Sequence, residues 1–161
     1  MIGFIGLGRM GLRMASRIST THHVVAYDLD PRAREKARGQ GVETVDNLSE
    51  LPVQLAPRRI VWIMVPAGAP VDDVISSIVE GFEQGDIIID GGNSHYKDSM
   101  KRAETLTQKG IHYLDVGTSG GLEGAEKGAS LTVGGPVEAY EAAFPLFETI
   151  ALPGACLLYT S

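Results

Sequence analysis

The stretch MIGFIGLGRMG, residues 1–11, decides the fold of this chain. Its apolar run Ile2–Gly6 predicts a buried strand, and a helical pattern begins directly after it. Between strand and helix, Gly6, Gly8 and Gly11 match the pattern G-x-G-x-x-G. In that position the first glycine permits a tight turn, the second lets a pyrophosphate approach the backbone, and the third lets the helix pack close to the strand. The stretch predicts a dinucleotide-binding turn, and a glycine-rich turn without a ligand is the alternative.

Strand-like and helix-like runs alternate along the rest of the chain. The predicted strands are Ile2–Gly6, Val24–Tyr27, Val42–Val45, Arg59–Val65, Ile87–Asp90, His112–Asp115 and Ser130–Val133. The predicted helices are Met10–Ser19, Pro31–Arg38, Val71–Glu80, Tyr96–Gln108 and Pro136–Ile150, the last with a break or kink near Phe144 because Pro145 lies inside it. The runs at Ile60–Val65 and Ile87–Ile89 are apolar at every position, which is typical of a sheet covered on both faces. We expect an α/β fold, a Rossmann-type, doubly wound and mainly parallel sheet with helices on both faces.

The composition is that of an ordinary globular domain. The 161 residues are 43% hydrophobic and 21% charged, which suffices for one domain with a core. A net charge of −6 is opposite to that of a nucleic-acid surface, and the apolar run Ile60–Val65 is far too short to cross a bilayer. The start shows no signal-peptide pattern, and one Cys with four scattered His shows no disulfide framework and no metal-ligand spacing. We expect a cytoplasmic protein with a small-molecule partner and no metal, nucleic acid or membrane.

An acid ends the second predicted strand. Asp28 follows the glycine turn by about 20 residues, where a carboxylate binds the ribose 2′-hydroxyl of NAD. The same charge would repel the 2′-phosphate of NADP, by up to about 4 kcal/mol per unit charge at about 4 Å and an effective dielectric near 20. NAD is therefore the expected cofactor, although Arg32 and Arg34 keep NADP from being excluded. A turn or helix-capping acid before Pro31 is the alternative for Asp28.

The stretch IIIDGGNSHYKDS, residues 87–99, ends another predicted strand with two glycines and an amide. Gly91 and Gly92 would let a cofactor ring and a substrate come close to the backbone. Asn93 can donate and accept hydrogen bonds at once, which suits a substrate beside a nicotinamide. The alternative is that Asn93 or Ser94 caps the next helix.

Two more strand ends carry small or polar residues. The segment VPAGA, Val65–Ala69, would present carbonyls and small side chains to a cofactor, with a plain turn as the alternative. The segment VGTSGGLEGA, Val116–Ala125, offers hydroxyls and bare N–H groups that suit anions, with a flexible linker as the alternative. Because the carboxyl ends of parallel strands meet at one edge, we expect Gly8, Asn93 and Ser119 to surround a common cleft.

Together these motifs resemble the N-terminal domain of the decarboxylating 6-phosphogluconate dehydrogenase family. The matching segments are GLGRMG (Gly6–Gly11), YDLD (Tyr27–Asp30), MVPAG (Met64–Gly68), IIDGGNS (Ile88–Ser94), SGGLEGA (Ser119–Ala125) and TVGG (Thr132–Gly135). The match extends to about Leu152, and IDGGNS is its specific part, since the related β-hydroxyacid dehydrogenases usually lack DGGN. Asp28-Leu29-Asp30 stands where many NADP-using members carry Asn-Arg-Thr or Asn-Arg-Ser, so the chain looks like the NAD-preferring branch.

The resemblance implies an oxidoreductase of the pentose phosphate pathway. Such an enzyme oxidises the C3 hydroxyl of 6-phosphogluconate by hydride transfer to a nicotinamide, and loss of CO2 then gives ribulose 5-phosphate. By this resemblance the cofactor-binding residues are Gly6, Leu7, Gly8, Arg9, Met10, Gly11, Asp28, Leu29, Asp30, Val65, Pro66 and Ala67. Asn93 would contact both cofactor and substrate, while Ser119, Gly120 and Gly121 would hold the sugar-acid phosphate.

The resemblance also implies residues that this sequence lacks. The family's general base is a Lys and its general acid a Glu, in a helical segment beyond the end of this chain, so we expect no catalytic residue and no turnover here. We expect a dinucleotide-binding domain at residues 1–152 and a tail at 153–161, with CLLYTS (Cys156–Ser161) a non-native translation of a sequencing adapter and a natural apolar tail as the alternative. The longer protein would be a homo-oligomer with a C-terminal helical domain, and the fragment a monomer. The alternatives are a β-hydroxyacid dehydrogenase of the 3-hydroxyisobutyrate type and a non-catalytic NAD-binding module.

Overall fold

One eight-stranded sheet runs through the computed structural model, which describes residues 1–152 and 157–160. The strands are β1 (Ile2–Ile5), β2 (Val24–Tyr27), β3 (Glu43–Thr44), β4 (Ile60–Ile63), β5 (Ile87–Asp90), β6 (His112–Ser119), β7 (Ser130–Gly134) and β8 (Leu157–Thr160). Their order across the sheet is β3-β2-β1-β4-β5-β6-β7-β8, and only the β6–β7 pair is antiparallel among the described strands. The predicted Rossmann-type, mainly parallel sheet is confirmed.

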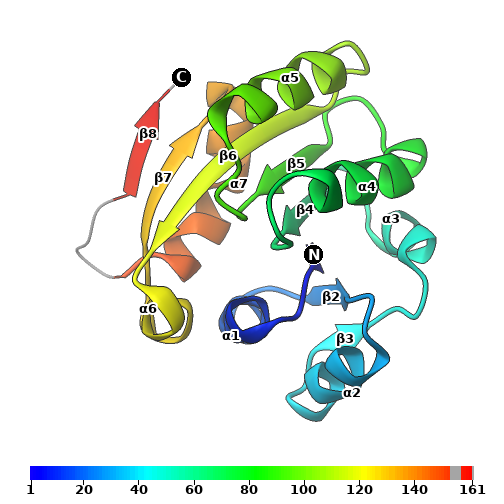
Figure 1. Ribbon diagram of the computed structural model, residues 1–161, viewed down its shortest axis with the longest axis vertical. Coiled ribbons are helices and arrows are strands. Elements are labelled where there is room, and N and C mark those ends of the chain that lie inside the picture. The colour runs from blue at the N-terminus through cyan, green and yellow to red at the C-terminus, as the bar shows by residue number, and fades with distance from the viewer. Residues whose placement is uncertain (153–156, 161) are drawn as a thin grey trace.

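Helices cover both faces of the sheet (Figure 1). They are α1 (Arg9–Ile18), α2 (Pro31–Gly39), α3 (Leu51–Gln54), α4 (Ala69–Ile78), α5 (Tyr96–Thr107), α6 (Gly121–Lys127) and α7 (Val137–Ile150), with short 3-10 turns η1 (Leu48–Glu50) and η2 (Val79–Gly81). Successive side chains of a strand point to opposite faces. Ile87 and Ile89 of β5 therefore pack in the core under α1 and α7, while Ile88 packs in the core under α3, α4 and α5. This two-sided burial explains why β5 is apolar throughout Ile87–Ile89.

The structure corrects several predicted boundaries. The strand predicted at His112–Asp115 continues to Ser119, because Asp115–Ser119 pair with β7 after the parallel pairing with β5 ends. The helix α6 follows at Gly121, so Val116–Ala125 is largely regular structure and the flexible-linker alternative is wrong. The third strand is shorter than predicted, and α3 was not predicted.

The break expected near Phe144 is absent from α7. This helix runs through Pro145 from Val137 to Ile150. Pro145 lies on the exposed side of the helix, so water can bind the carbonyl group that its missing N–H leaves free. The opposite side, which includes Ala143 and Phe147, is buried and holds the helix on the sheet.

The end of the chain contributes an edge strand. Leu157–Thr160 form β8, parallel to β7. Cys156 and Ser161, which bound the predicted non-native tail, lie outside the described residues. The origin of the tail and the domain boundary at residue 152 stay predictions. Within residues 1–152 and 157–160, no helix combines the length and hydropathy needed to span a membrane.

Candidate functional site

The glycine turn connects β1 to α1. Gly6 has a φ of +106°, and a Cβ atom there would lie 2.2 Å from the carbonyl oxygen of Met64. A Cβ at Gly11 would lie 1.9 Å from the carbonyl oxygen of Gly6, so only glycine lets the helix pack this close to the turn. At Gly8, a Cβ would meet no described atom within 4 Å. Gly6 and Gly11 are therefore needed for packing, whereas Gly8 borders open space.

The N-terminus of α1 faces that space without a side-chain cap among the described residues. Among the described residues, no side chain caps α1 at Gly8, and its first turn contains no acid. The first N–H groups of a helix lack partners within the helix and carry roughly half a positive charge from the helix dipole. An anionic group such as a pyrophosphate fits these features: free donors, positive potential and no side chain in the way.

Asp28 joins the end of β2 to the glycine turn. Its Oδ2 accepts a hydrogen bond of 2.6 Å from the backbone N–H of Leu7, and its Oδ1 accepts one of 2.8 Å from the N–H of Asp30. The capping role falls to Asp30, whose Oδ1 accepts from the N–H of Arg32 at 2.9 Å and begins α2. Asp28 therefore has the turn role that was its alternative, but not the capping role. It also holds the glycine turn before α1 in place.

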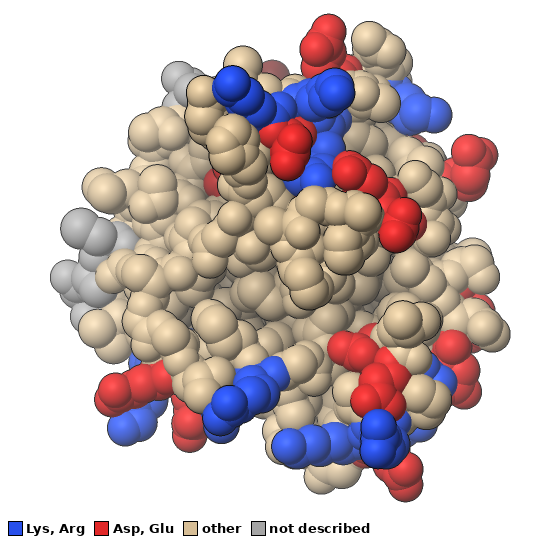
Figure 2. All heavy atoms as spheres, viewed as in Figure 1, with Lys and Arg blue, Asp and Glu red and all other residues tan. Residues whose placement is uncertain are grey.

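The predicted cofactor residues line two neighbouring clefts. Gly6, Asp28, Leu29, Val65 and Pro66 line one of about 650 Å³, which extends to Asp73 of α4. Leu7, Gly8, Arg9 and Asp30 line the other, of about 350 Å³. Neither lining includes Met10, Gly11 or Ala67. In the view of Figure 2, charged side chains lie mostly around the rim, and a band of uncharged residues crosses the middle of the face.

The loop after β5 holds Asn93 in an unusual backbone conformation. Its φ is +57°, which is uncommon for a residue other than glycine. Neither Asn93 nor Ser94 caps α5, because the cap is His95, whose Nδ1 accepts from the N–H of Lys97 at 3.2 Å. The capping alternative for Asn93 is therefore wrong.

The two glycines before Asn93 are required by the protein itself. A Cβ at Gly91 would lie 2.4 Å from Nε1 of Trp62, and one at Gly92 would lie 2.5 Å from the carbonyl oxygen of Val65. We expected these glycines to make room for a cofactor ring and a substrate. The structure corrects this interpretation, since the space beside them is filled by the end of β4 and the residues that follow it.

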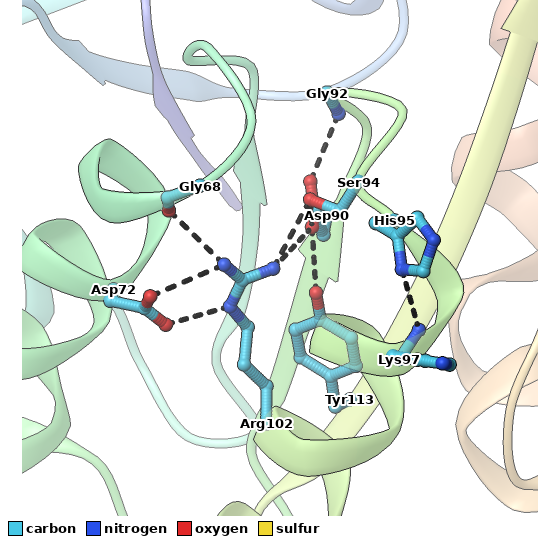
Figure 3. Close-up of polar contacts among 9 residues, drawn as sticks. All are labelled: Gly68, Asp72, Asp90, Gly92, Ser94, His95, Lys97, Arg102 and Tyr113. Atoms are coloured by element: carbon cyan, nitrogen blue, oxygen red, sulfur yellow. Dashed lines mark hydrogen bonds and ion pairs between the residues drawn. The ribbon is translucent and has the colours of Figure 1, made fainter.

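A buried carboxylate organises the same loop (Figure 3). Asp90, which is 0% exposed, accepts hydrogen bonds from the N–H of Gly92 at 3.0 Å, from the hydroxyl of Tyr113 at 2.6 Å and from the hydroxyl of Ser94. The guanidinium of Arg102 lies 3.7 Å from its Oδ2. Burial, together with the nearby charge of Asp90, raises the pKa of Tyr113 well above its usual range, so this hydroxyl stays a donor.

Asn93 lines a third cleft, of about 320 Å³, with Ser94, Asp115, Gly117 and Thr132. Burial, and then the charge of Asp90, raises the pKa of Asp115. Asp115 and Thr132 were not among the predicted site residues. The signal for Asp115 was available, because it ends the parallel part of β6 as Asp90 ends β5, and the two residues are paired in register.

The structure separates the loops that we expected around one cleft. Gly8 and Asn93 line different clefts, and Ser119 lines neither of these two. Ser119 is displaced because β6 continues beyond Asp115 as a ribbon with β7. Ser119, Gly120 and Gly121 are exposed at the end of that ribbon, where α6 begins and packs beside α1 (Figure 1).

Comparison with known proteins gives a consistent family. Residues 1–160 match the family model described as the NAD binding domain of 6-phosphogluconate dehydrogenase. The chain is 42% identical over 151 residues to the NAD(+)-dependent, decarboxylating 6-phosphogluconate dehydrogenase of Haloferax volcanii, covering 93% of this chain and 50% of that protein. It is 42% identical over 155 residues to the Bacillus subtilis protein of the same name, covering 93% of this chain and 33% of that protein. The chain thus spans half or less of the length of these relatives.

Solved structures agree on the fold. Plasmodium falciparum 6-phosphogluconate dehydrogenase, described in its apo form and with NADP+ or 6-phosphogluconate, matches with a TM-score of 0.90 and 34% identity over 99% of this chain and 36% of that chain. A Mycobacterium tuberculosis 3-hydroxyisobutyrate dehydrogenase matches with a TM-score of 0.86 and 26% identity over 99% of this chain and 54% of that chain.

Proposed function

Because the chain belongs to the family of NAD-binding domains of 6-phosphogluconate dehydrogenase, we propose that it is the cofactor-binding part of an oxidoreductase that oxidatively decarboxylates 6-phosphogluconate. The nicotinamide would accept the hydride from the substrate. The residues of this chain would bind and orient both molecules. Proton transfer would depend on a Lys and a Glu supplied by a segment outside these 161 residues, so the chain alone is expected to release no CO2.

The N-terminus of α1 is the feature that best supports cofactor binding. Open space at Gly8 and an uncapped helix start supply what a dinucleotide pyrophosphate needs, while the bond from the Leu7 N–H to Asp28 holds the turn in place. The cleft of about 650 Å³ beside Asp28 and Pro66 has room for the adenosine half. We therefore assign the cofactor to the predicted residues Gly6–Arg9, Asp28–Asp30, Val65 and Pro66, while Met10, Gly11 and Ala67, which line neither cleft, stay predictions.

NAD is the proposed cofactor because Asp28 lies in the adenosine cleft. A 2′-phosphate at this carboxylate would bring like charges together, whereas a ribose hydroxyl could donate to it. Of the two nearby arginines, Arg34 already donates to the backbone oxygen of Asp28 at 2.8 Å and lies 3.4 Å from Asp46. Arg32 is exposed and lines the neighbouring cleft, so NADP stays a second candidate ligand.

The test is calorimetric titration of the native chain and of Asp28→Asn with NAD and with NADP. The native chain should bind NAD more tightly than NADP, and Asp28→Asn should reduce this preference by about tenfold, since it removes the charge of the carboxylate proposed to face the ribose 2′-position. Asp73→Asn is the matched control, because Asp73 is an acid of the same cleft on α4 and should leave the preference unchanged. Tighter binding of NADP by the native chain would contradict the assignment.

For the substrate we propose Asn93, Ser119, Gly120 and Gly121. Asn93 is free of a capping role and lines the cleft beside Asp115, while the other residues are exposed at the start of α6. Their separation in this chain supports a substrate held between this domain and a further segment. The cytoplasm and a monomeric state of the fragment remain predictions.

Because the chain also matches the structure of a 3-hydroxyisobutyrate dehydrogenase, oxidation of a β-hydroxyacid is a second candidate reaction. A longer protein that carries this chain should reduce NAD with 6-phosphogluconate and not with 3-hydroxyisobutyrate. The opposite selectivity would favour the β-hydroxyacid dehydrogenase. Reduction with neither substrate, together with tight NAD binding, would favour a non-catalytic module.

A further inference from the structure

Arg102 is a buried cation that reaches two loops of the proposed site. It lies on α5 and is only 7% exposed. One side of its guanidinium donates to the backbone oxygen of Gly68 at 3.1 Å and binds the carboxylate of Asp72 at 2.7 and 3.3 Å. The other side donates to the hydroxyl of Ser94 at 3.2 Å and lies 3.7 Å from Asp90. Figure 3 shows the guanidinium between these two groups.

The two sides belong to different parts of the proposed site. Gly68 ends the cofactor-side loop Val65–Gly68, and Asp72 lies in the first turn of α4 after it. Ser94 and Asp90 enclose the substrate-side loop that carries Asn93. The planar guanidinium can bind both groups at once, in a fixed geometry that a lysine ammonium cannot reproduce.

We propose that Arg102 is a positioning residue that fixes the loop Val65–Gly68 and the loop Asp90–Ser94 relative to each other, and so sets Asn93 against the cofactor. The inference rests on the function proposed above. Asn93 keeps a φ of +57° because its neighbours hold it there, and Gly92 and Ser94 on either side of it both bind Asp90. Arg102 is the cation beside Asp90 and, in addition to the three hydrogen bonds, offsets part of the cost of burying its charge.

A purely structural role is the competing explanation, and the chain contains a matched control for it. Arg59 is also nearly buried and binds the buried Asp86 at 3.2 Å. It also donates to the carbonyl oxygen of Pro52 at 2.8 Å. This pair stands before β4 and β5, at the sheet edge opposite the site. Losing either arginine should destabilise the fold, but only Arg102 should control the site loops.

The experiment compares Arg102→Met, Arg102→Lys and Arg59→Met in the native full chain. Amide hydrogen exchange is followed by NMR at Gly92 in the loop and at Ile88 in the core of β5, and NAD affinity is measured by calorimetry. Arg102→Met should speed exchange at Gly92 about tenfold more than at Ile88 and weaken NAD binding about tenfold. Arg102→Lys should restore stability but leave NAD binding weakened. Arg59→Met should speed amide exchange at Gly92 no more than at Ile88, and it should leave NAD affinity unchanged.

Equal effects of Arg102→Met and Arg59→Met on Gly92 and on NAD affinity would overturn the proposal. If Arg102→Met does not fold, Asp72→Asn tests the same claim, because it removes an exposed carboxylate from the guanidinium and should speed exchange at Gly92 in the same direction. Failure of the native chain to bind NAD would refute the proposed function, while the exchange comparison would still decide the role of Arg102.

Discussion

At the residue scale, glycines that look alike in the sequence have different physical causes. Gly8 borders open space at the start of α1, whereas Gly92 is pressed against the carbonyl oxygen of Val65. The spacing G-x-G-x-x-G predicted an open approach to the backbone at Gly8, where a Cβ would meet no described atom within 4 Å, and the binding of a pyrophosphate there stays a prediction. The pair Gly91-Gly92 gave no such signal, because its requirement for glycine comes from Trp62 and Val65, which lie far away in the sequence.

Alanine at Gly8 and at Gly92 should separate binding from packing. Gly8→Ala should change the free energy of unfolding by less than about 0.5 kcal/mol and weaken NAD binding by roughly tenfold or more, since the new methyl group lies where the pyrophosphate should approach. Gly92→Ala should cost about 1–3 kcal/mol, because the backbone at Val65 must move. Urea unfolding and NAD titration of both variants provide the measurement. A destabilised Gly8→Ala with native affinity would contradict the role of the turn.

The partly buried carboxyl group of Asp115 should make stability depend on pH. Its folded pKa is raised above the ordinary value of 3.8, so the folded state holds the proton more tightly than the unfolded state. Stability should therefore fall as pH rises from 3.8 through the raised pKa, and stay lower at neutral pH. Asp115→Asn should be more stable than the native chain at pH 7, with the difference vanishing in acid. Urea unfolding of both proteins at pH 7 and in acid measures this difference in stability.

Asp46 is a control whose pKa is shifted in the opposite direction. Its pKa is lowered by the hydrogen bond and charge of Arg38, so Asp46→Asn should slightly reduce stability at pH 7, and this loss should disappear as pH falls. A loss of stability at pH 7 in Asp115→Asn would show that its carboxylate is satisfied in the fold and that the burial argument is wrong.

At the scale of elements, α7 shows a local rule overridden by packing. Pro145 predicts an interruption, yet buried side chains hold the helix on the sheet and Pro145 itself lies on the exposed side. Pro145→Ala should raise the free energy of unfolding by up to about 3 kcal/mol, because it restores a helical hydrogen bond and helix propensity. Glu148→Ala, an exposed change in the same helix, should have an effect below about 0.5 kcal/mol. Denaturant unfolding that shows no gain for Pro145→Ala would mean that the proline costs the folded helix little.

Elements with a local signal were predictable, and those defined by distant pairing were not. Apolar runs such as Ile87–Ile89 predicted β5 because both faces of that strand are covered. The extension of β6 to Ser119 comes from pairing with β7, which no local pattern reveals. The residues of the proposed site also divide into those with a local sequence signal and those defined by distant contacts. The motifs predicted Gly8, Asp28 and Asn93, but the contacts of Arg102 join α5 to residues 8 to 34 positions away.

At the scale of the whole molecule, the sheet order brings the glycine turn, the Asp90–Ser94 loop and the start of α6 to one side. Most of the residues proposed for the cofactor line clefts within the chain, whereas Asn93 and Ser119, proposed for the substrate, stay apart. The chain spans half or less of the length of its named relatives.

The most direct test of the proposed function is an NMR titration of the native chain with NAD, which reports both binding and its position. Saturable shifts should occur at the amides of Gly6–Gly11, Asp28–Asp30 and Val65–Ala67, with smaller shifts at Asn93. Shifts confined to the large cleft between α1 and α7, lined by Arg17 and Thr149, or no saturable shifts at all, would contradict the assignment of the cofactor to the glycine turn.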